Sequence, residues 1–161
     1  MTHQDTASGR VAALEDLLCF DLYAASRAVT ALYRPLLDEL GLTYPQYLVL
    51  VLLRADEVRP ISSIARDLQL DHGTLTPLLR RLQSAGLVSR TRSAADERVV
   101  QIALTADGVA LKEKFDALKC TIVDAMALDD TGARELQASL RTLATSVGRK
   151  TITATRPVVT P

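Results

Sequence analysis

Apolar residues recur at helical spacing in two neighbouring segments near the middle of the chain. The first segment has them at i, i+3, i+4 and i+7, in the order Ile61, Ile64, Ala65 and Leu68. The second segment repeats the spacing with Leu75, Leu78, Leu79 and Leu82. Gly86 then supplies a helix-stop signal, and a tight polar link at residues 70–73 separates the two segments. The pattern predicts two short helices joined by a turn.

Two strands are expected directly after this helix pair. The segments LVSRTR (87–92) and RVVQIALT (98–105) are rich in strand-forming residues, and SAADE between them is short enough only for a hairpin turn. Helix, turn, helix and hairpin is the order that lays one helix in the major groove of DNA with a β-wing beside it. The sequence therefore predicts a mainly α fold with a small β-wing, a winged helix-turn-helix. A solvated helix pair with a surface hairpin is the alternative.

Polar residues on the second helix and the hairpin have the chemistry that DNA recognition needs. Hydroxyls and imidazoles reach base edges, and arginines hold phosphates or guanine. The candidate DNA-binding residues are His72, Gly73, Thr74, Thr76, Pro77, Arg80, Arg81, Arg90, Arg92, Asp96 and Arg98. Pro77 is tolerated mainly in a first helical turn, so we expect the regular helix to begin late, near Thr74, or to be kinked.

The predicted DNA-reading unit is flanked by further helices. A long helix is expected from Val11 to Glu39, with a kink or break at Pro35 and an end at Gly41. A buried helix should follow, capped by Thr43 with Gln46 at the capping-box position, and then a loop, ADEVRP (55–60).

After the wing, the pattern predicts two more helices. Thr105 should cap the first, with Asp107 in its first turn and an apolar stripe that continues to Met126, before DDTG (129–132) breaks it. The last helix carries Leu136, Leu140, Leu143 and Val147, a seam suited to another helix. Leucine seams at both ends of so small a chain suggest an intertwined homodimer, with packing between the two terminal helices of one chain as the alternative.

The domain organisation follows from these elements. Residues 11–147 are predicted to form a single domain, with a winged helix-turn-helix at about 45–104 and dimerisation helices at about 11–40 and 106–147. We expect a flexible N-terminus at residues 1–10 and a disordered tail at residues 148–161.

The composition excludes fewer classes of function than the pattern of hydrophobic and polar residues does. Lys plus Arg and Asp plus Glu both number 19, so the formal net charge is zero. Residues 71–104 nevertheless contain five arginines against three acidic residues, so DNA binding would depend on local charge and on salt. The polar N-terminus predicts no signal peptide, and no apolar run is long enough for a membrane helix. Two cysteines then suggest the reducing cytoplasm, and the scattered histidines predict neither a metal site nor a cofactor.

Several longer motifs resemble those of a known family. GLVSRTRSAADERVVQIALTADG is similar to the wing of the MarR family of transcription regulators, which are dimeric winged-helix repressors. LCF-x-LYAASR, Y-x-PLLDELGLTYPQYL, LDHGTLTPLLRRL and RSAADERVV resemble the peroxide-sensing branch, the organic hydroperoxide resistance regulators. The resemblance covers the chain from about Leu14 to about Val147.

The resemblance implies a reactive cysteine. In that branch an organic hydroperoxide, the inducer, oxidises the cysteine that matches Cys19, and tyrosines of the partner subunit that match Tyr33 and Tyr44 hydrogen-bond it. Tyr23 lies at i+4 from Cys19, on the same helix face. Cys120 is the candidate resolving cysteine, because some members carry a second cysteine near this point that forms a disulfide with the first.

The residues around Cys19 do not by themselves provide a thiolate, the reactive form. Asp16 and Glu15 lie one turn away, and nearby anions disfavour it. Without the resemblance, the sequence favours Cys19 as a small buried hydrophobic residue and Cys120 as a residue on the side of a helix with no part in the chemistry.

Three functions remain open at this level. The first is a repressor that senses organic hydroperoxides through Cys19 and then releases double-stranded DNA. The second is a repressor on the same scaffold that a small phenolic ligand switches. The third is a thiol peroxidase that uses Cys19 and Cys120, although such an enzyme has no need of arginines on a hairpin.

Overall fold

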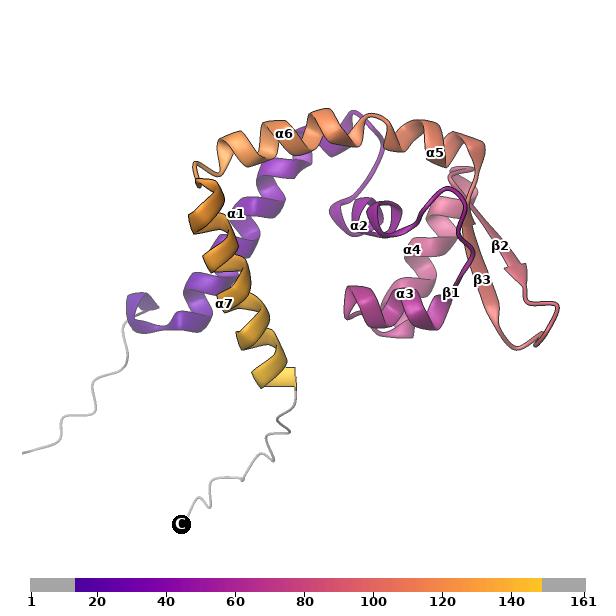
Figure 1. The fold of residues 1–161 in the computed structure, drawn as a ribbon, viewed down its shortest axis with the longest axis horizontal. Helices are drawn as coiled ribbons and strands as arrows, with labels where there is room; N and C mark the ends of the chain where they lie inside the picture. The colour runs from indigo at the N-terminus through magenta and orange to yellow at the C-terminus, as the bar shows by residue number, and fades with distance from the viewer. Residues whose placement is uncertain (1–13, 149–161) are drawn as a thin grey trace, which may run out of the picture. The chain divides into compact units, whose positions relative to one another are not determined.

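The computed structural model describes residues 14–148, which divide into two compact units between Lys119 and Cys120. The first unit contains, in order, η1 (Leu14–Asp16), α1 (Leu18–Asp38), α2 (Tyr44–Leu52), β1 (Arg59–Pro60), α3 (Ile61–Leu68), α4 (His72–Ser84), β2 (Val88–Arg92), β3 (Val100–Leu104), α5 (Ala106–Lys112) and the start of α6 (Phe115–Ala125) (Figure 1). The second contains the rest of α6 and α7 (Asp130–Gly148). The predicted flexible N-terminus lies outside the described residues. So does the predicted tail, apart from Gly148, which ends α7.

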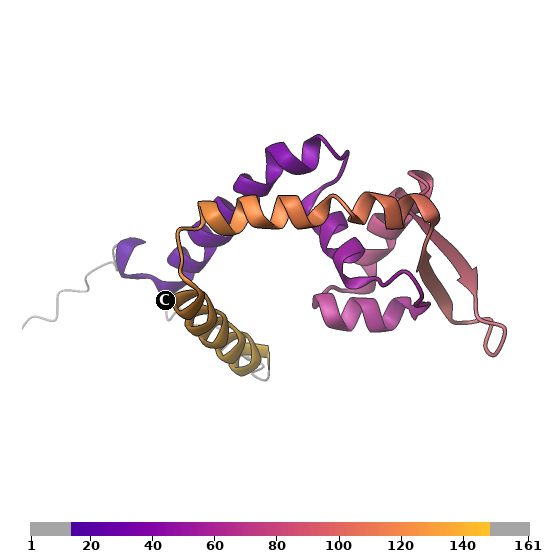
Figure 2. The same ribbon diagram turned by 45° about the horizontal axis from the view of Figure 1, so that its top comes forward.

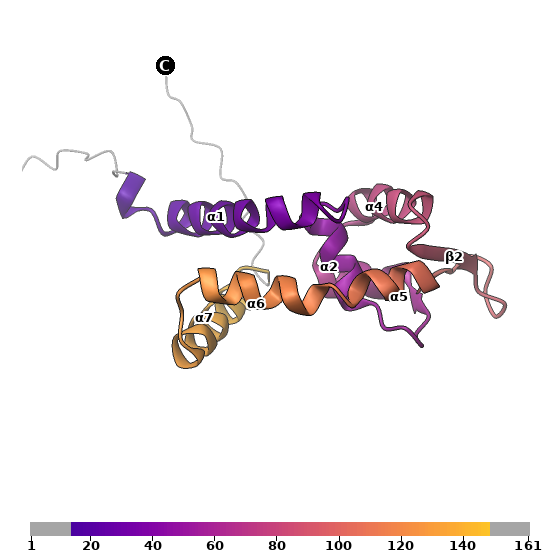
Figure 3. The same cartoon turned by 90° about the horizontal axis from the view of Figure 1, so that it is seen from above.

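The first helix is shorter than the predicted range of Val11 to Glu39, because α1 begins at Leu18 and ends at Asp38. Leu17 has an extended backbone and separates α1 from η1, which is turned away from the axis of α1 (Figure 3). The helix then continues past Pro35 to Asp38, so of the two predicted alternatives, a kink or a break, the break is wrong.

Gly41 ends α1 as expected. Its φ of +67° is left-handed, a conformation that glycine adopts without steric cost. The Leu42 N–H donates to the Leu37 carbonyl at 2.9 Å, and the Gly41 N–H donates to the Asp38 carbonyl at 3.1 Å. These two bonds form a Schellman motif, which turns the chain towards α2.

The α2 helix forms much of the core of the first unit. The predicted capping box is confirmed: the Gln46 side-chain oxygen accepts from the Thr43 N–H at 2.8 Å and from the Thr43 hydroxyl at 3.0 Å. Val49, Leu50 and Leu53 are completely buried. At the C-terminal end, the Lys112 ammonium of α5 donates to the carbonyls of Val51 and Leu53, which lack partners within the helix.

The helix-turn-helix is confirmed, and of the two alternatives for its second helix, a late start near Thr74 or a kink, the late start is wrong. Gln69, with a left-handed φ of 54°, turns the chain out of α3, and α4 starts at His72. The Asp71 carboxylate caps α4 by accepting from the Thr74 N–H and the Thr74 hydroxyl, both at 2.8 Å. This cap stabilises the first turn, so the helix already begins at His72, and Pro77 lies inside it.

One face of α4 is the core face that the leucine spacing predicted. Leu75, Leu79 and Leu82 are completely buried, and Leu78 is half-buried. Burying each such side chain contributes roughly 1.5–3 kcal/mol. Because this face is buried, the opposite face of α4 points toward solvent.

The wing is a hairpin with an additional strand beside it. β2 and β3 pair antiparallel from Val88↔Leu104 to Arg92↔Val100, and the loop between them projects beyond α3 and α4 (Figure 2). β1 also pairs with β3, in the order β1-β3-β2, where a plain loop was expected. Two residues are too few to show a strand alternation, and Pro60, which lacks an N–H, is tolerated at a sheet edge.

The single helix predicted after the wing is in fact two. Thr105 caps α5 as expected, accepting from the Gly108 N–H at 3.1 Å. α5 ends at Lys112, and the Lys114 N–H bonds to the Leu111 carbonyl three residues back. This tight turn barely disturbs the apolar spacing, which therefore reads as continuous.

α7 begins inside the predicted DDTG breaker, at Asp130. Its seam residues Leu136, Leu140 and Val147 are 48%, 42% and 62% exposed.

Gly108 makes the closest approach in this region, and its replacement is the first testable prediction. A Cβ at this position would lie 2.1 Å from the Leu87 carbonyl oxygen, which is backbone and cannot move aside cheaply. Gly108→Ala should therefore lower the free energy of unfolding by about 2–3 kcal/mol. Gly148→Ala is the matched control, since a Cβ there meets nothing within 4 Å. Urea unfolding measures both, and equal stability of the two variants would refute the close approach.

Candidate functional site

A groove of about 410 Å³ lies between the helix-turn-helix and the wing. α4 contributes His72 and Thr76, and the wing contributes Arg90 and Arg98. Ser62 from the first turn of α3 completes the polar lining, with Ile61, Val99 and Val100 as apolar walls. Among the described residues no carboxylate lines this groove, so its polar surface offers hydroxyls, an imidazole and two guanidinium groups. Such a set suits the phosphates and base edges of DNA.

Two arginines of the wing are held differently. Arg90 is half-buried, and among the described residues its Nε has no hydrogen-bond partner although the atom is buried. Arg98 is exposed near the hairpin loop, and the Asp96 carboxylate accepts from its backbone N–H at 3.0 Å. Asp96 therefore shapes the loop that carries Arg98 by bonding to the main chain.

The other predicted DNA-binding residues do not line this groove. Gly73, Pro77, Arg80, Arg81 and Arg92 are exposed on α4 and β2. Thr74 uses its hydroxyl to cap its own helix through Asp71. Ser62 was missed by sequence reasoning, because a serine in the first turn of a helix gives no distinctive signal.

Cys19 is the second residue of α1 and is exposed, so it is not a core residue of this chain. Tyr23 lies one turn further on and is 56% exposed. Its hydroxyl accepts from the Arg27 guanidinium at 3.0 Å, and that guanidinium also lies over the Tyr23 ring, 5.6 Å from its centroid. Tyr23 is thus paired with Arg27 in this chain.

Three other tyrosines form a cluster with a phenylalanine. Tyr33 of α1 packs against Tyr44 and Tyr47 of α2, with centroid distances of 4.9 and 5.5 Å. Tyr47 also meets Phe115 of α6 edge to face at 4.9 Å. The sequence reasoning assigned no chemistry to Tyr47. Its position three residues after Tyr44, on the same face of α2, is the signal that could have found it.

Burial keeps these phenols protonated. The pKa of Tyr33 is raised to about 12, first by burial and then by the neighbouring hydroxyls of Tyr47 and Tyr44. Burial likewise raises the pKa of Tyr44 and of Tyr47. All three hydroxyls therefore remain hydrogen-bond donors at neutral pH.

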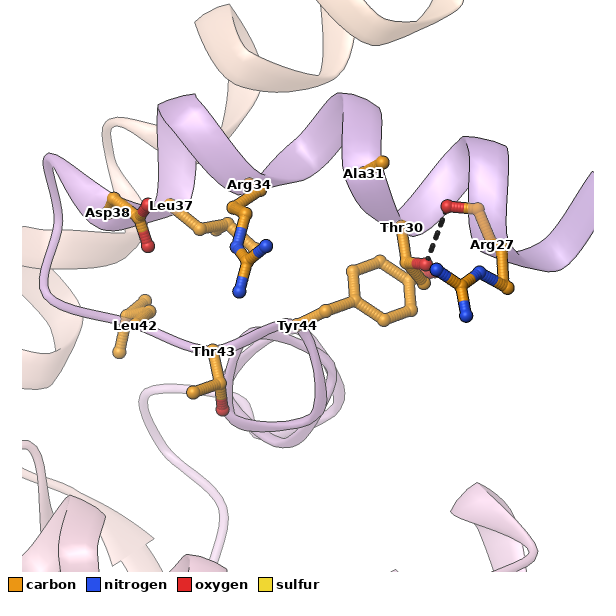
Figure 4. Close-up of a pocket in the computed structure, with 9 residues that line it drawn as sticks. All are labelled: Arg27, Thr30, Ala31, Arg34, Leu37, Asp38, Leu42, Thr43 and Tyr44. Carbon is orange, nitrogen blue, oxygen red and sulfur yellow. Dashed lines mark hydrogen bonds between the residues drawn. The ribbon is translucent and has the colours of Figure 1, made fainter.

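A second cavity, of about 400 Å³, lies between α1 and the start of α2. Arg27, Thr30 and Arg34 line it from α1, and Tyr44 lines it from α2, with its ring beside Thr30 (Figure 4). One ring, Tyr44, thus belongs both to the tyrosine cluster and to the wall of a cavity with two guanidinium groups.

The candidate resolving cysteine, Cys120, is exposed on α6. Within residues 14–148 no group of acidic, histidine and cysteine side chains is arranged to hold a metal ion, and no helix there is long and apolar enough to cross a membrane.

The fold and the groove define the class of this protein as a winged-helix DNA-binding regulator. A family model described as transcriptional regulator SarA/Rot matches residues 31–115. The organic hydroperoxide resistance transcriptional regulator of Bacillus subtilis is 45% identical over 137 residues, which cover 85% of this chain and 93% of that protein. The chain belongs to the MarR family of transcription regulators, in the branch of the organic hydroperoxide resistance regulators.

Solved structures of AbfR, a protein of Staphylococcus epidermidis, are similar to this chain in three states. Reduced AbfR bound to DNA is 34% identical, with a TM-score of 0.69 over 84% of this chain and 92% of that one. Overoxidised AbfR bound to DNA gives a TM-score of 0.66 at 34% identity, over 83% and 94% of the two chains. Disulfide-formed AbfR gives 0.57 at the same identity, over 84% and 90%.

The wing generates the second prediction. Arg98→Ala should weaken DNA binding without lowering the melting temperature, since the Arg98 side chain is exposed. Loss of one phosphate or groove contact should also reduce the slope of log affinity against log salt by about one. Arg134→Ala, which removes the same charge from an exposed side chain of α7, should change neither the affinity nor the slope. If Arg98→Ala behaves like this control in a salt series, the wing does not contact DNA.

Proposed function

We propose that this protein is a homodimeric repressor that binds a pseudo-palindromic operator in double-stranded DNA and releases it when an organic hydroperoxide oxidises Cys19. The observation that carries the DNA-binding part is the groove, where the outer face of α4 and the wing present His72, Thr76, Arg90 and Arg98 together. The relative in Bacillus subtilis, named for organic hydroperoxide resistance, supports the choice of inducer. Two free cysteines and a DNA partner support the proposal that it acts in the cytoplasm.

The proposed dimer explains why the sensing residues lie apart along α1. Tyr33 follows Cys19 by 14 residues in the same helix, which at 1.5 Å per residue is about 21 Å. Tyr33 therefore cannot hydrogen-bond the cysteine of its own chain, whereas Cys19 of a second copy is free to approach it. The exposed apolar residues Leu17, Leu18 and Phe20 beside Cys19 offer surface for such a contact.

The proposed chemistry begins with the Cys19 thiolate. The sulfur attacks one peroxide oxygen, the O–O bond breaks, and the leaving alkoxide takes up a proton to become an alcohol. Sulfur is oxidised by two electrons, the peroxide is reduced, and the product is a sulfenic acid. The Cys120 thiol of the partner subunit then condenses with the sulfenic acid, forming an S–S bond and releasing water.

We assign DNA release to the disulfide. AbfR has been solved on DNA both reduced and overoxidised, so overoxidation is compatible with a DNA complex in that protein. A disulfide instead joins two helices and restricts how the attached DNA-reading units are held. A tenfold loss of affinity requires only about 1.4 kcal/mol of difference between the two states.

A second candidate function has one observation in its favour. The cavity between α1 and α2 has the size to accept a small phenolic ligand, and its wall offers the guanidinium groups of Arg27 and Arg34 beside the Asp38 carboxylate. A ligand there would switch the same scaffold without cysteine chemistry. The thiol peroxidase is set aside, because it would leave the donor-lined groove at α4 unexplained.

Cys19→Ser tests the proposed sensor. Serine preserves the size of the side chain but cannot form a sulfenic acid, so the variant should bind operator DNA like reduced wild type. Added organic hydroperoxide should lower wild-type affinity at least about tenfold and leave the variant unchanged. Tyr33→Phe and Tyr44→Phe should respond more slowly. Gel shifts across a peroxide series measure this, and release of Cys19→Ser at the wild-type dose would favour the ligand-switched alternative.

Cys120→Ser tests the resolving step. Peroxide-treated wild type should show a dimer-sized band on non-reducing gels that reductant removes, and the variant should not form it. Because the disulfide is assigned to release, the oxidised variant should also retain DNA at doses that release wild type. A wild type that stays monomer-sized on these gels would make Cys120 a spectator.

A further inference from the structure

Arg90 of β2 occupies a position where the strand pattern favours an apolar residue. Residues directly opposite each other in an antiparallel pair project from the same face of the sheet, and Arg90 lies opposite Ile102 of β3, which is completely buried. Val88, two residues earlier in β2 and therefore on the same face, is buried as well. A charged side chain on the core face of a sheet is costly unless it has a partner, so this arginine requires an explanation.

A second arginine in the same row of the sheet has such partners. Arg59 of β1 lies opposite Ile102 from the other side, and its guanidinium forms ion pairs with Asp67 at 2.5 Å and with Glu57 at 3.5 Å. Arg90 differs from it. Within residues 14–148 its side chain makes no hydrogen bond or ion pair, and its buried Nε has no acceptor.

The surroundings of Arg90 in the groove consist of hydrogen-bond donors. Arg90 lines the groove between the helix-turn-helix and the wing together with Ser62, His72 and Thr76, and no carboxylate of the described residues lies in that lining. Every polar side chain near Arg90 in the groove can donate a hydrogen bond, and none of them supplies a negative charge. An unpaired guanidinium among such donors is complementary to an anion with several acceptor oxygens.

The position of the groove identifies this anion as a phosphate of the DNA backbone. A recognition helix lies in the major groove, and an arginine at the tip of a wing suits the adjacent minor groove. One sugar–phosphate strand separates the two grooves of a duplex, so a strand must pass between α4 and the wing. Arg90 lies between these two elements, whereas Arg98 is exposed near the hairpin loop.

We propose that Arg90 is a phosphate clamp: its guanidinium, unpaired in the free protein, binds one backbone phosphate of the DNA strand that passes between α4 and the wing. The inference rests on the proposed function, which assigns this groove to DNA. Arginine suits the task, because its planar fork can donate two parallel hydrogen bonds to one phosphate. The contact fixes the position of the duplex against α4 and carries no direct information about the base sequence.

A clamp that has no partner in the free protein does not stabilise the fold. Methionine keeps the apolar stem of the side chain and removes the charge, so Arg90→Met should leave the melting temperature unchanged or raise it. Arg59→Met is the matched control, because it removes a charge from the same row of the sheet but breaks two ion pairs. It should lower the melting temperature, since two carboxylates lose their partner.

DNA binding tests the clamp itself. The probe is a short duplex that the wild-type protein selects from a random pool, and the full-length proteins are titrated against it over a salt series. Arg90→Met should bind at least about tenfold more weakly and reduce the slope of log affinity against log salt by about one. Arg90→Lys keeps the charge but not the fork, so it should retain the slope and recover only part of the affinity. Arg134→Met, which removes an exposed charge from α7, should change neither quantity.

Methylphosphonate substitution in the same duplex locates the contact. Replacing one phosphate at a time removes its charge and one acceptor oxygen, so the wild type should lose affinity wherever it contacts a phosphate. At one phosphate in each half-site this loss should be about tenfold in the wild type and absent in Arg90→Met, because the protein partner of that phosphate is already missing.

Three outcomes would overturn the clamp. Arg90→Met could lower the melting temperature as far as Arg59→Met does, which would make Arg90 a structural residue. Its affinity and salt slope could equal those of the wild type. Its losses could match those of the wild type at every methylphosphonate, which would assign Arg90 to a base edge. Failure of the proposed function is distinct, because the wild-type protein would then select no duplex from the pool.

Discussion

Burial of α2 is the constraint on which the rest of the first unit depends. This helix contacts α1, α3, α4 and α5, and its residues Val49 and Leu50 are completely buried. Removing such side chains from water contributes roughly 1.5–3 kcal/mol each, so the surrounding helices are held against it. Its ends are closed by polar contacts, Gln46 with Thr43 at the start and the Lys112 ammonium at the last carbonyls. Burial and the nearby Arg54 lower the pKa of Lys112.

The DNA-reading surface follows from that core. Burial of Leu75, Leu79 and Leu82 fixes the orientation of α4 about its helix axis. His72 and Thr76, on its outer face, therefore line the groove. The end of the wing is joined to the link that follows α4, because the Thr105 N–H bonds to the Leu87 carbonyl and the Thr105 hydroxyl bonds to the Gly86 carbonyl, and β2 packs against α4. A change that moves α2 would therefore move the recognition helix and the wing together.

The tyrosines to which we assign a part in the proposed sensing chemistry lie on α2 or pack against it. Tyr44 and Tyr47 lie in the first turn of α2 and pack against Tyr33 of α1. A movement of α1 would therefore act on α2, which contacts α4. Small differences in free energy suffice for such a switch, since a packed core has discrete arrangements. The tyrosine cluster lies where α1 meets α2, next to the cavity that Tyr44 also lines.

The sequence by itself determined the features that depend on periodicity and local bonding. The leucine face of α4, the capping box at Thr43, the stop at Gly41, the cap at Thr105 and the hairpin are all local, and each is as predicted. Tertiary structure decided what the local pattern does not encode. β1 exists only because β3 offers it a partner, and the turn at residues 113–114 leaves the spacing unbroken. The meeting of Tyr47 with Tyr33 and Phe115 joins three helices, and contacts between residues far apart in sequence arise only when the chain packs.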